Sequence, residues 1–190
     1  MKPVDLTETQ LTTETVFRGQ LLHVKQDTVR LPNGNKTGRE YIVHPGAVLI
    51  VPLLGDGRLV MERQYRYPLR QTFIEFPAGK IDPNEDPLAT GQRELLEESG
   101  YIALEWHYLV ALHPCIGYSD EIIYIYLATD LQDGKHNRDH DEILEVFTLT
   151  LDEAMEAMRR GEITDSKTMI ALFWVDKYLK GIWGDTEFGQ

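Results

Sequence analysis

Three glutamates stand close together within residues 79–101, at Glu94, Glu97 and Glu98. At a helical period of 100° per residue, all three fall on one side of a helix together with Arg93. Glutamates three or four residues apart repel by roughly 0.2–0.5 kcal/mol per pair, and the helix dipole disfavours anions in the last turn by about 0.3–1 kcal/mol each. Arg93 is expected to balance one of them, so the cluster predicts a bound cation. Hard carboxylate oxygens suit Mg²⁺, with Mn²⁺ as a substitute.

The helix that must carry these acids has recognisable ends. Asp86 suits an N-cap and Pro87 suits the first helical position. Gly100 supplies the left-handed residue that ends the helix. The apolar side is formed by Leu88, Ala89, Leu95 and Leu96. We therefore expect a helix that packs by its leucine side and presents a stripe of carboxylates.

A solvated acidic face is the ordinary alternative to a metal site, because charged residues mostly lie on protein surfaces. Two observations favour the metal site. The acids are confined to one side of the helix, and glycines flank the segment at Gly79 and Gly100.

The same segment resembles the Nudix box. In that pattern a glycine is followed after five residues by glutamate. Seven residues later come Arg-Glu, an aliphatic residue, any residue, Glu-Glu, any residue, glycine and a bulky apolar residue. Every defined place is filled, by Gly79, Glu85, Arg93, Glu94, Leu95, Glu97, Glu98, Gly100 and Tyr101. The resemblance implies an α/β fold, the Nudix α/β/α sandwich with a mixed sheet, and hydrolysis of a nucleoside diphosphate linked to another group.

The resemblance also implies roles for individual residues. The carbonyl of Ala78 would ligate metal together with Glu94, Glu97 and Glu98, and Glu97 and Glu98 are the candidate catalytic residues. Structural roles in the box fall to Gly79, Glu85, Arg93 and Gly100, with Glu85 orienting the loop and Arg93.

Composition narrows the class of protein. The chain has 190 residues, a hydrophobic fraction of 42% and a net charge of −12. The acidic balance, without a basic patch, argues against a nucleic-acid-binding protein and suits one that recruits divalent cations. No signal peptide and no apolar run of membrane-spanning length is found. The single cysteine, Cys115, fits a reducing cytoplasm.

The chain is expected to form two domains that meet at Pro45-Gly46. Residues 1–14 look like a loose lead-in. Strands are predicted around Val16-Phe17 and over 21–30 and 36–43, with a hairpin turn at 32–35. A meander this small cannot bury both faces alone, so residues 1–45 must pack on the main domain or on a second subunit. Nudix enzymes that act on ADP-ribose often carry such a sheet and use it in a dimer, which makes a homodimer our expectation.

Residues 46–190 form the predicted Nudix hydrolase domain. Its first strand, 47–54, is apolar throughout and should be buried on both faces. The other expected strands are 58–65, 72–76, 106–112, 122–129 and 144–150, and the expected helices after the box are 151–160 and 166–180. Asp152 is the predicted start of the first of these helices.

Two residues outside the box are candidates for substrate binding. Arg66 follows a strand among aromatic residues, and its guanidinium suits a phosphate or a nearby acid. The loop 117–121 is similar to one that lies over the substrate in ADP-ribose pyrophosphatases. There Glu121 would accept a bond from a ribose hydroxyl or the adenine amine. The proline typical of that subfamily is replaced by Ile116.

The charged segment 131–141 is predicted to be a loop. In similar ADP-ribose hydrolases a glutamate of this loop closes over the substrate as metal ligand or catalytic base. Glu142 is the candidate here, with Asp141, Asp139 and His140 behind it.

Taken together, these features predict Mg²⁺-dependent hydrolysis of the pyrophosphate bond of ADP-ribose to AMP and ribose 5-phosphate. The alternatives keep the reaction and change the substrate to GDP-mannose or another nucleotide-sugar, NADH or a dinucleoside polyphosphate. A ligand-sensing module without turnover is a further alternative, but such modules commonly lose glutamates of the box, and this chain has lost none.

Overall fold

A computed structural model describes residues 3–134 and 143–184. Its internal contacts divide the chain into two compact units. The first unit comprises the chain up to Pro45 together with Cys115–Ile122, and the second comprises Gly46–Pro114 and the chain from Ile123 onwards. The segment Cys115–Ile122 lies within the predicted range of the hydrolase domain, yet it contacts the N-terminal strands.

The first unit is an antiparallel sheet of three strands in the order β1-β2-β3. The strands are β1 (Thr9–Arg18), β2 (His23–Arg30) and β3 (Lys36–Ile42). The turn between β2 and β3 contains Gly34 with φ +88°, a conformation that favours glycine. β1 begins earlier than predicted, because residues from Thr9 onwards pair with β2. The expectation of a loose lead-in was therefore wrong for residues 9–14.

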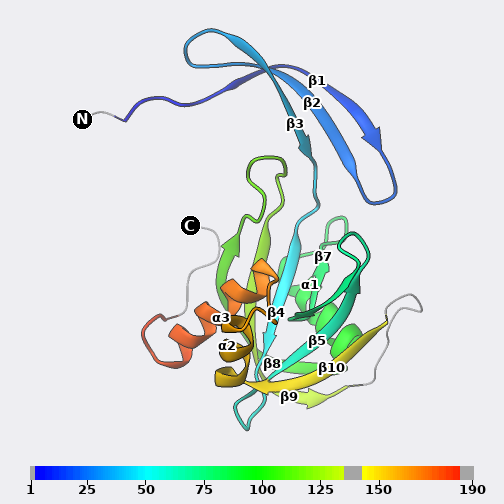
Figure 1. The fold of residues 1–190 in the computed structure, drawn as a ribbon, viewed down its shortest axis with the longest axis vertical. Coiled ribbons are helices and arrows are strands. Elements are labelled where there is room, and N and C mark those ends of the chain that lie inside the picture. Colours follow the sequence, from blue (N-terminus) through cyan, green and yellow to red (C-terminus); the bar gives the residue numbers. More distant parts are fainter. Residues whose placement is uncertain (1–2, 135–142, 185–190) are drawn as a thin grey trace. The chain divides into compact units, whose positions relative to one another are not determined.

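The second unit contains two sheets (Figure 1). One has the order β10-β5-β6, and the other has the order β7-β4-β9-β8. The second is a mixed sheet, since β4 and β9 run parallel and the remaining pairs are antiparallel. The strands are β4 (Ala47–Pro52), β5 (Arg58–Arg66), β6 (Gln71–Glu75), β7 (Ala78–Lys80), β8 (Tyr101–Leu112), β9 (Ile123–Asp133) and β10 (Leu144–Thr150).

In the part of the chain that the structure describes, four helical elements accompany these sheets. They are α1 (Pro87–Glu94), the π-helical turn η1 (Leu95–Ser99), α2 (Leu151–Arg159) and α3 (Ser166–Leu179). Thr150, not the predicted Asp152, caps α2, because its hydroxyl and the side chain of Glu153 form a reciprocal capping box. Within the described residues, no helix combines the length and apolar character needed to cross a membrane.

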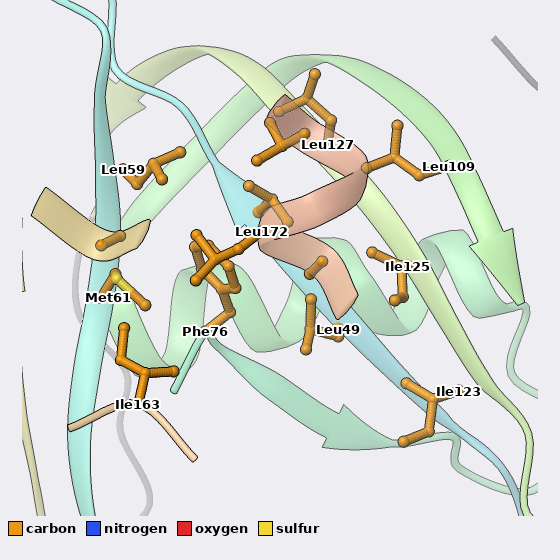
Figure 2. Close-up of a cluster of buried hydrophobic side chains, with 14 of the residues drawn as sticks. Leu49, Leu59, Met61, Phe76, Leu109, Ile123, Ile125, Leu127, Ile163 and Leu172 are labelled. Atoms are coloured by element: carbon orange, nitrogen blue, oxygen red, sulfur yellow. The ribbon is translucent and has the colours of Figure 1, made fainter. Parts of the chain in front are cut away.

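The core explains why β4 is apolar along its whole length. Leu49 and Val51 belong to a buried cluster that also contains Leu172 of α3, and Figure 2 shows Leu49 and Leu172 in that cluster. Val48 and Ile50 point to the opposite face, into a second cluster with Leu95 of η1. Side chains of a strand alternate between faces, so β4 is covered by η1 on one face and by α3 on the other. This arrangement confirms the predicted α/β/α layers and mixed sheet.

Candidate active site

The acidic helix departs from a regular α-helix at its end. α1 stops at Glu94, and residues 95–99 form a π turn before Gly100 ends the element with φ 78°. Glu94 and Glu98 are 8% and 3% exposed, while Glu97 is half-buried. The burial of Glu94 and Glu98 goes against a solvated acidic face, the ordinary alternative to a metal site. The π turn changes the angular spacing of the side chains, and two of the three acids point into the protein.

Gly79 lies directly against one of these acids. A Cβ atom placed on Gly79 would be 1.9 Å from the carboxylate carbon and from Oε1 of Glu94. A larger residue at position 79 would therefore force the Glu94 carboxylate out of its present place. This contact gives the spacing from Gly79 to Glu94 a physical reason.

Arg93 binds three carboxylates at once. Its Nη1 donates to Glu94 Oε1 at 2.7 Å and to Glu97 Oε2 at 3.1 Å. Its Nε and Nη2 donate to the two oxygens of Glu85 at 3.0 and 2.9 Å, and Nη2 also reaches the carbonyl of Lys80. One guanidinium carries one positive charge and so balances one carboxylate, but its five donors in a planar fork let it bond all three.

The charge of Glu85 is fixed by these contacts. The hydrogen bond from Arg93 is the main cause that lowers the pKa of Glu85 to about 2, and Thr90 Oγ1 donates a further bond at 2.7 Å. The same pairing raises the pKa of Arg93. Glu85 and Arg93 thus form an ion pair at neutral pH that ties the loop before α1 to the acidic end of the helix.

The third acid is held by the backbone. Glu98 Oε2 accepts a hydrogen bond of 3.0 Å from the amide of Ala78. Together with the Gly79–Glu94 contact and the Arg93 bonds, this brings Ala78, Glu94, Glu97 and Glu98 to one place. All of these residues belong to the second unit.

The donor chemistry at this place fits a divalent cation. Carboxylate and carbonyl oxygens are the ligands that Mg²⁺ and Mn²⁺ prefer, and Gly79, which has no side chain, lets the Glu94 carboxylate approach the backbone next to Ala78. Within residues 3–134 and 143–184, however, no three acidic, histidine or cysteine side chains already stand in a metal-holding arrangement. The reason is local, since Glu94 and Glu97 are turned to Arg93 and Glu98 is turned to the Ala78 amide.

Arg66 lies in a separate ion-pair cluster of the second unit. Its Nε and Nη2 donate to the two oxygens of Glu75 at 2.7 and 2.8 Å. Lys167 also bonds Glu75 Oε2. Of the two roles open to Arg66 from the sequence, a phosphate contact or a pair with a nearby acid, the structure contains the acid pair.

Glu121 lies in the first unit, next to β3. Its carboxylate is 3.7 Å from Nδ1 of His44, and its amide donates to Ser119 Oγ. The neighbouring Asp120 accepts a bond from the amide of His44 at 2.7 Å. Glu142, and with it Asp139, His140 and Asp141, lies outside the described residues.

Sequence reasoning missed the cluster around Glu75. Asp165 caps α3, and Lys167 Nζ donates to its Oδ2 at 3.0 Å while also binding Glu75. A signal was present in the sequence, because Glu75 interrupts an otherwise apolar strand end, Phe73 to Phe76. A buried acid of this kind calls for a cationic partner.

Comparison with known families identifies the domain that contains these acids. Residues 43–173 match the NUDIX domain, and residues 8–42 match the nucleoside diphosphate sugar hydrolase N-terminal domain. The chain belongs to the Nudix hydrolase family, whose members generally need a divalent metal. The resemblance of residues 79–101 to the Nudix box is thereby confirmed.

Individual relatives resemble the chain over nearly its whole length. It is 40% identical over 167 residues to the methanol dehydrogenase activator of Bacillus methanolicus, covering 87% of this chain and 90% of that protein. It is 37% identical over 169 residues to the ADP-ribose pyrophosphatase of Bacillus subtilis, with coverages of 88% and 91%. A crystal structure of an ADP compounds hydrolase superposes with a TM-score of 0.85 at 30% identity, covering 94% of this chain and 98% of that one.

Proposed function

We propose that this Nudix hydrolase is an Mg²⁺-dependent pyrophosphatase that hydrolyses ADP-ribose to AMP and ribose 5-phosphate. The single observation that carries the proposal is the meeting of Glu94, Glu97 and Glu98 with the Ala78 backbone beside Gly79. The choice of ADP-ribose is supported by the relatives of similar length, among them the ADP-ribose pyrophosphatase of Bacillus subtilis.

In this proposal Glu94, Glu97, Glu98 and the Ala78 carbonyl hold the cation. A divalent ion held by these residues would neutralise charge on the substrate phosphates and activate water for the attack. Arg93 fixes the side chains of Glu94 and Glu97, and Glu85 in turn fixes Arg93. Positioned groups of this kind lower the entropic cost of reaching the transition state.

Proton transfer is assigned to the same group of acids. A general base must lie within hydrogen-bonding reach of the attacking water. Glu97 is half-buried and Glu98 is almost fully buried, so both sit where a bound water would be shielded from bulk solvent. Glu142 is the third candidate base.

Substrate binding is assigned to Arg66 and Glu121. Arg66 keeps 41% of its side chain exposed while Glu75 holds one edge of its guanidinium, which suits contact with a phosphate. Glu121 accepts hydrogen bonds through its carboxylate, which suits a ribose hydroxyl or the adenine amine.

The enzyme is proposed to be cytoplasmic, which the single cysteine, Cys115, supports.

The N-terminal sheet is proposed to form a homodimer interface. Every residue of β1 is exposed, including the apolar Val16 and Phe17. Light scattering coupled to gel filtration should give the mass of two chains, and Phe17→Arg should reduce it to one. A single-chain mass for the unmodified protein would contradict the dimer.

Product analysis tests the substrate. The protein is incubated with ADP-ribose, GDP-mannose or NADH and Mg²⁺, and the products are separated by chromatography. We expect AMP and ribose 5-phosphate, with ADP-ribose the preferred substrate. Relatives named GDP-mannose pyrophosphatase are 33% identical to the chain over 67% of its length. Preferred cleavage of GDP-mannose would therefore show that the proposed reaction is right and the proposed substrate is wrong. Absence of turnover on all three would contradict the proposed activity.

A further inference from the structure

Glu75 joins two cations from distant parts of the chain. It ends β6, and it receives two bonds from Arg66 at the end of β5. Its Oε2 also accepts from Lys167 in the first turn of α3, 92 residues away. Lys167 is itself held by Asp165, the cap of α3, at 3.0 Å. The path Asp165–Lys167–Glu75–Arg66 therefore connects the start of α3 to the end of β5.

The surroundings of Glu75 favour a second cation. The Glu75 side chain is 2% exposed, and Glu62, also buried, is its direct partner on the neighbouring strand. Two acids opposite each other in a sheet are unfavourable. Burial alone would raise the pKa of Glu75, but the hydrogen bonds from Arg66 and the charge of Lys167 outweigh it and lower that pKa. Lys167 thus helps to keep Glu75 ionised.

An ionised Glu75 fixes the direction of the Arg66 guanidinium. Two of its nitrogens, Nε and Nη2, are bound in the paired geometry that arginine makes with carboxylates. The third, Nη1, makes no hydrogen bond to any residue in the described part of the chain. The side chain remains 41% exposed, so its unbound edge is available to an anion. If Glu75 were protonated or turned away, this orientation would be lost.

We propose that Lys167 is a positioning residue for substrate binding, acting through Glu75 on Arg66. The proposal rests on the proposed function, in which Arg66 binds a substrate phosphate. Lys167 itself does not touch the substrate. Its side chain is 16% exposed, and among the described residues its ammonium group bonds two carboxylates, those of Glu75 and Asp165.

The same turn of α3 also holds the backbone that leads to Ala78. Thr168 Oγ1 accepts a bond from the amide of Phe76 at 3.2 Å and donates to Asp165 Oδ2 at 2.7 Å. Since Phe76 is two residues before Ala78, a change at Lys167 can act on Arg66 or on this backbone. The two effects differ in kinetics, because a misplaced Arg66 weakens substrate binding and a misplaced Ala78 affects turnover.

The test compares Lys167→Met with Lys167→Arg and with Lys177→Met. Lys177 is a matched control, since it lies on the same helix and also pairs with an aspartate, Asp176, at 3.1 Å. KM and kcat for ADP-ribose are measured at saturating Mg²⁺, at a temperature where circular dichroism shows each variant folded. We expect Lys167→Met to raise KM about tenfold, equivalent to about 1.4 kcal/mol, and to leave kcat nearly unchanged. Lys167→Arg should restore most of the loss, and Lys177→Met should match the unmodified protein.

A double-mutant cycle distinguishes positioning from simple stabilisation. On an Arg66→Met background, Lys167→Met should raise KM no further, since residues that act through each other are not additive. An unchanged KM with a lowered melting temperature, or an equal rise in KM on both backgrounds, would overturn the proposal. If Lys167→Met does not fold, Lys167→Gln is measured in its place, because glutamine removes the positive charge and keeps a hydrogen-bond donor to Glu75. Failure of the unmodified protein to cleave ADP-ribose would overturn both proposals, whereas normal cleavage with an unaffected Lys167→Met overturns only this one.

Discussion

Gly79 and Glu94 approach each other so closely that a Cβ atom on Gly79 would lie 1.9 Å from the Glu94 carboxylate. The backbone of β7 and the Glu94 carboxylate are thereby in direct contact. A methyl group at position 79 must displace either the carboxylate or the strand that carries Ala78.

We predict that Gly79→Ala lowers kcat by at least tenfold and weakens the dependence of activity on Mg²⁺, because it moves a proposed metal ligand. The measurement is a titration of initial rate against Mg²⁺ concentration. Gly55→Ala is the control, since a Cβ there meets nothing within 4 Å. Equal rates for both variants would show that the close contact has no role in catalysis.

We predict that Glu98→Gln keeps the fold and lowers kcat by about 10²–10⁴-fold, the range typical of general acid–base groups. The side-chain oxygen of glutamine can still accept the hydrogen bond from the Ala78 backbone amide, so the fold should persist while the negative charge at position 98 is lost. Far-ultraviolet circular dichroism and steady-state kinetics measure the two effects. Glu162→Gln, an exposed acid paired with Arg160, is the control. Near-normal turnover of Glu98→Gln at saturating Mg²⁺ would contradict the assignment of Glu98 as a metal ligand and catalytic residue.

The Glu85–Arg93 pair predicts that the free energy of unfolding depends on pH. The pKa of Glu85 falls from its ordinary value of 4.5 to about 2 in the folded protein. A lowered folded pKa stabilises the fold above the unfolded pKa, and this contribution is lost as the pH falls from about 4.5 towards 2. Urea unfolding between pH 6 and pH 3 should therefore show a smaller decline for Glu85→Gln than for the unmodified protein. Parallel declines would contradict the pairing, and Glu105→Gln serves as the exposed control.

Metal binding predicts a thermal shift. A ligand that binds only the folded state stabilises it by about 2.7 kcal/mol at one hundred times its dissociation constant. Calorimetric scans with and without Mg²⁺ should show a higher melting temperature with the ion, and Glu94→Gln should reduce that increase. A melting temperature that does not change with Mg²⁺ would contradict metal binding at these acids.

Local patterns in the sequence were sufficient to predict part of this fold. The apolar run 47–54 predicted a strand buried on both faces, and Gly100 predicted the end of the acidic helix. The π turn at Leu95–Ser99 escaped prediction because a fixed period of 100° per residue was assumed. The Lys167–Glu75 bond and the pairing of Ile42 with Ser119 link residues far apart in the chain, and no local pattern contains such information.

Arg93 gives the protein an internal counter-ion for the very acids that are proposed to hold a metal. The repulsion within the cluster is therefore already reduced when the chain folds, and folding does not have to wait for magnesium. An arriving ion competes with a guanidinium for partly neutralised oxygens, which weakens its binding compared with three bare carboxylates. Occupancy of the site should then track the free magnesium of its surroundings, so that the ion comes and goes while the scaffold stays intact.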